Sequence, residues 1–321
     1  MNVLGLPRRP LASVVVPTWN GASLLASCLI SLAHQTYPNV EVVVADGAST
    51  DTSLEVVRSV LPGARFLRLD RNRGFAGNVN AGLRAARGDV LLLLNNDAWA
   101  NPEWVEASVR SLLSDERRGA VAARMVFEDG RINAAGDGLD RAGRAFQRGA
   151  GEPDGPAFDT PALVLGASGG AVAYRRTMLE DVGLFDEWYF AYLEDVDLAL
   201  RAQLRGWSAL YEPAARVVHR GSATGGGPLA SYYNARNSIR LLVKTVPSAL
   251  LPGLLPAILR AQARKAADAA AAWRGAAARA TLRGLAAGLW TLPLHLAARR
   301  AVQARRTVPP DHVLRMLAER P

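Results

Sequence analysis

The 321-residue chain has a single cysteine and only two lysines among its 38 basic side chains. The lone Cys28 cannot form an intramolecular disulfide or supply a cysteine-based zinc site, which excludes disulfide-stapled secreted domains and zinc fingers. A reducing compartment fits this composition. Half of the residues are apolar and 21% are charged, so disorder is excluded and the chain is long enough for one large core or two modest ones.

Long apolar runs are also absent. Residues 1–10 contain two arginines but no apolar segment before a strand-like run, so we expect no secretory signal. The two longest uncharged apolar stretches, 245–259 and 284–298, have 15 residues each and contain proline. Because a membrane-spanning helix needs about 20 residues, these stretches predict either interfacial helices or core helices.

The net charge of +9 is concentrated in the C-terminal quarter. From Arg236 onward the chain has 15 Arg and Lys against 3 Asp and Glu, whereas residues 1–235 have 23 against 26. Nucleic acid is one partner for such a segment, but its Leu, Ala, Pro and Trp content is more typical of a segment on anionic lipid. We therefore expect an anionic membrane surface and no nucleic acid as partner. Packing of these helices on the core is the alternative.

Apolar runs and helical periodicity alternate in the first part of the chain, which predicts a parallel sheet wrapped by helices. The expected strands are 12–17, 40–46, 64–69 and 90–94, and the expected helices are 24–32, 50–60 and 77–86. Further along, we expect loops with short strands over 125–160, strand-like structure over 163–174, a helix over 194–205, strands at 208–211 and 217–219, and helices from Ser231 onward.

Polar clusters follow three of the expected strands, at the sheet edge where such folds bind ligands. They are 18–20, 46–51 and 95–97, and we expect them to face one crevice. Asp97 directly follows the most apolar strand, a rigid support for a carboxylate that binds Mg²⁺ or Mn²⁺. A helix cap before Pro102 explains Asp97 equally well.

The other polar positions also have two interpretations. Asp46 lies at a turn suited to a nucleoside, although Ser49–Asp51 is also an ordinary helix cap. Asn78 and Asn80 lie in a segment that opens a helix, where free N–H groups favour phosphate, but turn preference explains such residues without a ligand.

Three carboxylates occupy four positions at Glu194, Asp195 and Asp197. The helix dipole and a pairing with Arg201 explain Asp197. They do not explain two adjacent acids, which raise each other's pKa, as expected where a general base is tuned. His219 ends an apolar strand and is either structural or a metal ligand.

Signatures of several other enzyme classes are missing. Residues 163–171 (LVLGASGGA) imitate a glycine-rich dinucleotide loop, but no G-x-G-x-x-G is present. No P-loop, G-x-S-x-G or H-E-x-x-H occurs either. Dehydrogenases, P-loop NTPases, α/β-hydrolases and zincins therefore lack their motifs here.

Eight ordered segments over about residues 12–240 resemble family 2 glycosyltransferases, in particular the bacterial rhamnosyltransferase-like branch. The segments are VVPTWNG (15–21), DGASTD (46–51), NRGFAGNVNAG (72–82), LLNND (93–97), GLFDEWYFAYLEDVDLALR (183–201), GW (206–207), VVH (217–219) and YYNARN (232–237). The resemblance implies an α/β GT-A fold, which is Rossmann-like, with a C-terminal helical extension. It also implies sugar transfer from a nucleoside-diphosphate donor with inversion at the anomeric carbon.

The same resemblance implies roles for five residues in nucleotide binding. Thr18, Asn20 and Asp46 would hold the nucleoside. Asn78 and Asn80 would lie near the ribose or the diphosphate.

Metal and catalytic roles follow from the resemblance in the same way. Asp97 corresponds to the last position of the family's D-x-D-like metal motif, whose first position is here the neutral Asn95. His219 would be a third contact of a divalent cation, Mg²⁺ or Mn²⁺. Asp195 would be the general base, with Glu194 tuning it or binding the acceptor.

We therefore expect an N-terminal tail over 1–11, a GT-A domain over 12–227 and a basic helical extension over 228–321. The expected enzyme is of the hexosyltransferase type. It acts at the cytoplasmic face of the cell membrane and moves a sugar, with rhamnose a candidate, to a hydroxyl of a glycan or polyprenyl-linked acceptor in cell-envelope polysaccharide synthesis. One alternative is a catalytically silent, membrane-docked scaffold, supported only by Asn95. A nucleotidylyltransferase ranks third, because a glycine-rich N-terminal loop followed by a basic residue is missing.

Overall fold

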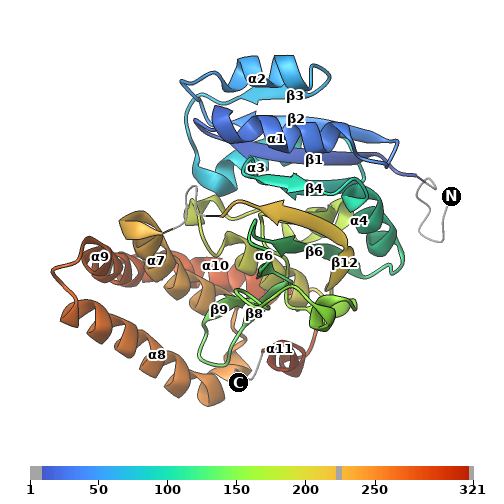
Figure 1. Ribbon diagram of the computed structural model, residues 1–321. Coiled ribbons are helices and arrows are strands. Elements are labelled where there is room, and N and C mark those ends of the chain that lie inside the picture. Colours follow the sequence, from blue (N-terminus) through green and yellow to red (C-terminus); the bar gives the residue numbers. More distant parts are fainter. Residues whose placement is uncertain (1–8, 222–225, 318–321) are drawn as a thin grey trace.

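A computed structural model describes residues 9–221 and 226–317, so most of the expected tail over 1–11 lies outside the described residues. A twisted sheet forms the centre, and the C-terminal helices gather beyond one end of it (Figure 1). The strands are β1 Ala12–Thr18, β2 Val40–Asp46, β3 Arg65–Arg68, β4 Val90–Leu94, β5 Ala98–Ala100, β6 Arg118–Val126, β7 Ile132–Ala134, β8 Asp137–Leu139, β9 Ala145–Gln147, β10 Ala162–Val164, β11 Ala171–Arg175 and β12 Ser208–His219.

The sheet is mixed rather than parallel throughout. Its main path runs β10-β12-β6-β11-β4-β1-β2-β3. Strands β4, β1, β2 and β3 pair in parallel, as expected from the alternating pattern. Strand β11 pairs antiparallel with both β4 and β6, whereas β6 and β12 pair in parallel again. The strands expected at 208–211 and 217–219 are one strand, β12, with irregular pairing between Glu212 and Arg216.

Helices cover both faces because the central strands are apolar on both sides. They are α1 Ala22–Ala33, α2 Ser53–Val60, α3 Gly74–Ala85, α4 Trp104–Leu113, α5 Arg176–Val182, α6 Glu194–Leu204, α7 Gly227–Thr245, α8 Leu251–Ala271, α9 Ala276–Trp290, α10 Leu292–Ala304 and α11 Pro310–Met316. Three short 3-10 helices complete them: Pro156–Phe158, Glu187–Tyr189 and Ser248–Leu250. Val14 and Val16 face a core with α1, α2 and α4. Val15 faces a second core, with α3, α5 and α6.

The C-terminal helices pack on the remainder of the chain through α7. Residues of α6, α7, α8 and α11 share a third apolar cluster. Helix α9 approaches α7 closely, because a Cβ atom on Gly284 would lie 2.3 Å from the carbonyl oxygen of Tyr232. The two 15-residue apolar stretches therefore contribute buried residues such as Ile258, Gly284 and Gly288, and also exposed ones such as Leu259 and Trp290.

Among the described residues, no single helix has the length and apolarity needed to cross a membrane. Helix α7 and the segment Ser248–Ala271 meet this criterion only when taken together, and they are bent by 105° relative to each other.

Candidate functional site

The three polar clusters expected to lie together do so, at the carboxyl ends of the adjacent strands β2, β1 and β4. The backbone N–H of Gly47 donates to the carbonyl oxygen of Thr18 at 2.8 Å. The Asn96 amide donates to Thr18 Oγ1 at 3.0 Å. Thr18 is therefore the point at which the three clusters are joined.

Asn20 and Asp46 organise the loops around this point. Asn20 has a left-handed backbone (φ 49°), and its Oδ1 accepts from the backbone N–H of Thr50 at 2.8 Å. The side chain of Asp46 is fully buried and accepts from the N–H of Ser49 at 3.1 Å. The Asp46 contact is a local turn interaction, whereas the Asn20 contact joins two loops that are distant in the sequence and fixes them relative to each other.

Asn78 and Asn80 lie two residues apart on α3 and form hydrogen bonds with different parts of the chain. Asn78 accepts from the N–H of Arg73 at 3.1 Å and donates to Asn72 at 3.1 Å, which closes the loop before α3. Asn80 donates to the carbonyl oxygen of Phe185 and to Glu187, and accepts from the N–H of Phe185. Both amide hydrogens of Asn80 are thus already used within the protein.

Asp97 and His219 meet although they are far apart in the sequence. Strand β12 pairs with β5, which places His219 opposite Ala98, and His219 Nε2 lies 3.1 Å from Asp97 Oδ1. His219 Nδ1 lies 3.0 Å from Oδ1 of the buried Asn133. In this assignment Asn133 accepts from Nδ1–H, which leaves the Nε2 lone pair directed at the carboxylate. Two such electron-rich atoms attract each other only when a proton or a metal cation lies between them.

A divalent cation suits the donors at this position. Asn95 lies two residues before Asp97, and its buried Oδ1 has no hydrogen-bond partner. Asp97 and His219 supply a carboxylate and an imidazole that lie together, and Asn95 carries an unpartnered amide oxygen two residues away; Mn²⁺ and Mg²⁺ accept these donor types when water or phosphate completes the shell. No cluster of three His, Cys, Asp or Glu residues with metal-binding geometry occurs in the described ranges.

Asp195 occupies the first turn of α6 and is held by two backbone donors. The N–H groups of Gly169 and Val196 donate to its two oxygens at 3.1 and 2.8 Å. Burial raises the pKa of Asp195, and these two donors oppose the rise. A carboxylate with a raised pKa is a stronger base, so the direction of the shift suits proton abstraction.

Two further carboxyl groups, those of Glu194 and Asp137, lie close enough to Asp195 to interact with its charge. Burial, followed by the charge of Asp195, raises the pKa of Glu194 well above its usual value. Burial, followed by the charges of Asp195 and Glu194, does the same for Asp137 on β8. Each has one buried oxygen without a partner, Glu194 Oε2 and Asp137 Oδ2. The neighbouring negative charges raise these pKa values, as the adjacent acids in the sequence suggested, but burial makes the larger contribution.

The glycine-rich segment over 163–171 connects Asp195 to the candidate metal residues. Gly169 donates to Asp195, and the carbonyl oxygen of the next residue, Gly170, accepts from the N–H of Asn95 at 2.9 Å. A Cβ on Gly166 would lie 2.3 Å from the Cβ of Ala199, so glycine is required where this loop passes α6. The segment that imitates a dinucleotide loop is therefore a close-packed connection within the site.

The turn before Glu194 adopts an unusual backbone. Phe190, Tyr192 and Leu193 all have positive φ angles, between 65° and 70°, which bulky residues adopt only when the surroundings impose them. Helix α7 supplies the restraint. The side-chain amide of Asn237 donates to the carbonyl oxygens of Tyr189, Ala191 and Tyr192 at 2.8 to 3.1 Å.

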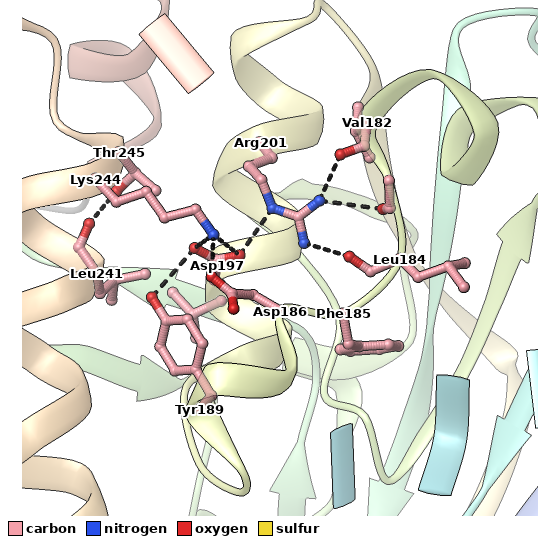
Figure 2. Close-up of polar contacts among 12 residues, drawn as sticks. Val182, Leu184, Phe185, Asp186, Tyr189, Asp197, Arg201, Leu241, Lys244 and Thr245 are labelled. Carbon is pink, nitrogen blue, oxygen red and sulfur yellow. Dashed lines mark hydrogen bonds and ion pairs between the residues drawn. The ribbon is translucent and has the colours of Figure 1, made fainter. Parts of the chain in front are cut away.

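A buried ion cluster fixes α6 against the same helix (Figure 2). Lys244 Nζ lies 2.8 Å from Asp186 Oδ2 and 2.7 Å from Asp197 Oδ1, and all three side chains are largely shielded from solvent. Arg201 pairs with Asp197 at 2.8 Å, as expected from their spacing, and Tyr189 also donates to Asp197. Although burial acts in the opposite direction, Lys244 and then Arg240 lower the pKa of Asp186 to about 2. Lys244 and Arg201 likewise lower the pKa of Asp197 against the effect of burial, so both carboxyl groups of the cluster are ionised at neutral pH.

Sequence reasoning missed Asp137, Asn133 and Lys244. The first two lie on short strands in a region expected to be mostly loops. Lys244 could have been singled out from the sequence, because it is one of only two lysines in a chain with 36 arginines. A lysine retained against that bias marks a position where a compact ammonium group fits and a planar guanidinium does not.

Comparison with known proteins identifies the family. The family model described as Glycosyl transferase family 2 matches residues 13–183. The chain belongs to glycosyltransferase family 2. It is 30% identical over 247 residues to an N-acetylglucosaminyl-diphospho-decaprenol L-rhamnosyltransferase of Mycobacterium tuberculosis, covering 70% of this chain and 80% of that protein. It is also 30% identical over 229 residues to the O-antigen biosynthesis protein RfbC of Myxococcus xanthus, covering 67% of this chain but only 18% of that protein.

Solved structures confirm the GT-A fold of this glycosyltransferase. A mannosyltransferase from Pyrobaculum calidifontis, solved with GDP-Man and Mn²⁺, superposes with a TM-score of 0.56 at 22% identity, covering 97% of this chain and 81% of the other. Residues 1–349 of Staphylococcus aureus TarS, solved with UDP-GlcNAc, give a TM-score of 0.55 at 22% identity, covering 78% and 71%. The expected α/β fold with a C-terminal helical region is thus confirmed.

Replacing Lys244 tests the buried cluster of this glycosyltransferase. Lys244→Met preserves much of the side-chain volume but leaves two buried carboxylates short of a cation, so we expect the free energy of unfolding to fall by about 3 kcal/mol. Lys265→Met is the matched control, since Lys265 forms only a 3.5 Å hydrogen bond to Ser238. Chemical denaturation measures both. A loss no larger for Lys244 than for Lys265 would show that the cluster does not stabilise the fold.

Proposed function

We propose that this glycosyltransferase is inverting and metal-dependent, and that it uses Asp195 as its general base. The observation that supports this most directly is the short backbone connection from Asp195 through Gly169 and Gly170 to Asn95, two residues before Asp97. This connection links Asp195, whose pKa is raised by burial, to the segment that carries the Asp97–His219 pair. In a one-step displacement, the general base and the groups that stabilise the leaving phosphate act on the same sugar carbon, so they must lie close to each other.

The proposed reaction is a single displacement. An acceptor hydroxyl loses its proton to Asp195 while its oxygen forms a bond to the anomeric carbon. The bond from that carbon to the diphosphate oxygen breaks on the opposite face, and the nucleoside diphosphate leaves with the electron pair. Attack from the opposite face inverts the configuration at this carbon.

The donor side of the site is assigned to the residues around β1, β2 and α3. Thr18, Asn20 and Asp46 are proposed to hold the nucleoside, and Asn78 to lie near the diphosphate. Asn80 has no free amide hydrogen, so its proposed role is to hold the Phe185–Glu187 segment. Asp97, His219 and Asn95 would bind the divalent cation, which when bound neutralises charge that develops on the leaving phosphate.

The relatives support the choice of substrates. The rhamnosyltransferase of Mycobacterium tuberculosis is named for an N-acetylglucosaminyl-diphospho-decaprenol acceptor, and the Myxococcus xanthus protein for O-antigen biosynthesis. Two structural neighbours were solved with nucleotide sugars. We therefore propose a nucleoside-diphosphate sugar donor, with rhamnose a candidate sugar. The proposed acceptor is a glycan hydroxyl on a polyprenyl diphosphate, used in cell-envelope polysaccharide synthesis.

The catalytic role of Asp195 is tested by an amide substitution. Asp195→Asn preserves the side-chain size and one of the two backbone hydrogen bonds through its remaining oxygen, but it removes the base, so we expect kcat to fall by on the order of a thousandfold. Thermal protection by UDP-, GDP- or dTDP-sugars should be unchanged. Asp311→Asn is the control, because it makes the same change at an exposed position on α11, and it should keep its turnover. Undiminished turnover in Asp195→Asn would refute the assignment.

The metal assignment is tested through nucleotide binding. We expect Mn²⁺ to increase the thermal protection that a nucleoside diphosphate gives, and EDTA to abolish the increase, because the cation links carboxylate and phosphate. Asp97→Ala and His219→Ala should each remove the Mn²⁺-dependent part of the shift. His34→Ala, which changes a histidine at the end of α1, should retain it. A wild-type response in both site variants would place the cation elsewhere.

We propose that helices α8, α9 and α10, called the outer helices below, associate with a membrane surface. Large apolar side chains are exposed on α8, α9 and α10 and in the turn between α8 and α9: Leu255, Leu259, Trp273, Leu289, Trp290, Leu294 and Leu296. Arginines such as Arg260, Arg274 and Arg283 lie on the same helices and turn. Exposed Trp and Leu together with arginine are typical of surfaces that lie in the headgroup region of anionic membranes.

Vesicle sedimentation tests this surface. Trp290 is 88% exposed, so Trp290→Ser should leave the fold intact and reduce binding to phosphatidylglycerol vesicles severalfold. Leu163→Ser is the control, because Leu163 is 68% exposed on β10, away from these helices. Equal sedimentation of both variants and wild type would exclude Trp290 from the membrane contact.

A further inference from the structure

A groove of about 460 Å³ lies between α8 and α9, with one residue of α7 and the β8–β9 connection on its walls. It is separate from the sheet edge that carries Asp97. Figure 1 shows that α8 and α9 diverge from their connecting turn, with the hairpin of β8 and β9 beside α8. The lining residues are Arg144, Ser231, Ala261, Arg264, Lys265, Asp268, Ala269, Ala272, Ala277, Ala278 and Thr281.

Lys265 is the unusual residue of this groove. Its side chain is partly buried, and burial lowers its pKa. Its one hydrogen bond, to Ser238 Oγ, is 3.5 Å long. Within residues 9–221 and 226–317, neither Lys265 nor the adjacent Arg264 has a carboxylate within ion-pair distance, although Asp268 lies one turn away on the rim. A desolvated ammonium group without a counter-ion is a favourable contact for an anion.

Apolar surface surrounds these cations. Five alanines line the groove: Ala261 and Ala269 on α8, Ala272 directly after it, and Ala277 and Ala278 on α9. The adjoining outer surface carries the exposed Leu259 and Trp273. Aromatic or amide side chains that would select a nucleobase are absent from the lining. The combination of a cationic centre with an alanine floor suits a ligand with an anionic head and a hydrocarbon tail.

Residues on both walls of the groove belong to segments that contact the surroundings of Asp195. Ser238, which contacts Lys265, directly follows Asn237, whose amide holds the turn before Glu194. On the other side, Arg144 belongs to the hairpin whose first strand begins at Asp137, one of the carboxyl groups beside Asp195. The hairpin is fixed to α7, since Leu139 and Leu242 share an apolar cluster.

We propose that this groove binds the diphosphate and the first isoprenoid units of a polyprenyl-diphosphate-linked acceptor, with Lys265 and Arg264 contacting the diphosphate. The assignment rests on the proposed glycosyl transfer to a lipid-linked acceptor. It adds that the acceptor enters from the outer helices and places its sugar at Asp195 between the hairpin and α7. Arg144 is already paired with Asp140 at 2.7 Å and contributes as a wall of the groove.

Binding of farnesyl diphosphate in EDTA tests the groove without the metal-dependent donor site. Calorimetry should show binding to the wild-type full chain and at least tenfold weaker binding to Lys265→Gln, because one charge-assisted contact is lost. Lys265→Arg should restore most of the affinity. Arg260→Gln is the control: it removes one positive charge from the same helix outside the groove lining, and it should bind like wild type.

Three results would overturn the proposal. The first is equal binding of farnesyl diphosphate to wild type and Lys265→Gln. The second is equal weakening by Lys265→Gln and Arg260→Gln, which would show a general charge effect. The third is Lys265-dependent binding of phosphatidylglycerol vesicles with no binding of farnesyl diphosphate, which would identify a lipid headgroup site. Hydrolysis of the nucleotide sugar, measured in the same variants, should stay at the wild-type rate, and its absence in wild type would instead refute the proposed function.

Discussion

Lys244 is the residue on which the placement of the site depends. Its ammonium group lies between Asp186 and Asp197, on either side of the turn that leads into Glu194 and Asp195. A buried charge without enough partners is costly, and without Lys244 the two carboxylates would keep only Arg240 and Arg201 as cationic partners. Because Lys244 comes from α7 and Asp197 from α6, the helix that carries Asp195 cannot shift without separating buried charges. Fold stability and site geometry therefore have the same origin.

The site forms where the sheet changes direction. Strand β4 pairs in parallel with β1 and antiparallel with β11. The amino end of β11 consequently lies beside the carboxyl end of β4, and this is why Gly170 reaches Asn95. A wholly parallel sheet would place the residues before β11 at the opposite edge. The antiparallel strand is thus what brings the Asp195 region to the polar residues that follow β4.

The sequence predicts the N-terminal half of the fold well because each element there has an unambiguous period. Strands β1, β2 and β4 are largely apolar on both faces, and the helix α1 that connects the first two has apolar residues at helical spacing. Short strands such as Ile132–Ala134 and Asp137–Leu139 are below the length at which periodicity is informative. The antiparallel pairing of β11 and the Asp137 and Asn133 contacts depend on long-range packing, which no local pattern records. The meeting of Asp97 and His219 was anticipated only through the ordered motifs of the family. The boundary expected at residue 227 stays a prediction, and the Lys244 contacts cross it.

The close packing of α9 against α7 has a mechanical consequence. At Gly284 the two backbones meet without intervening side chains, so little soft material lies between them to absorb a displacement. At its other side α7 is hydrogen-bonded to the turn with three positive φ angles. The outer helices are thus coupled through α7 to the turn that precedes Asp195, so a displacement of α9 would have to be taken up by α7 and by this turn.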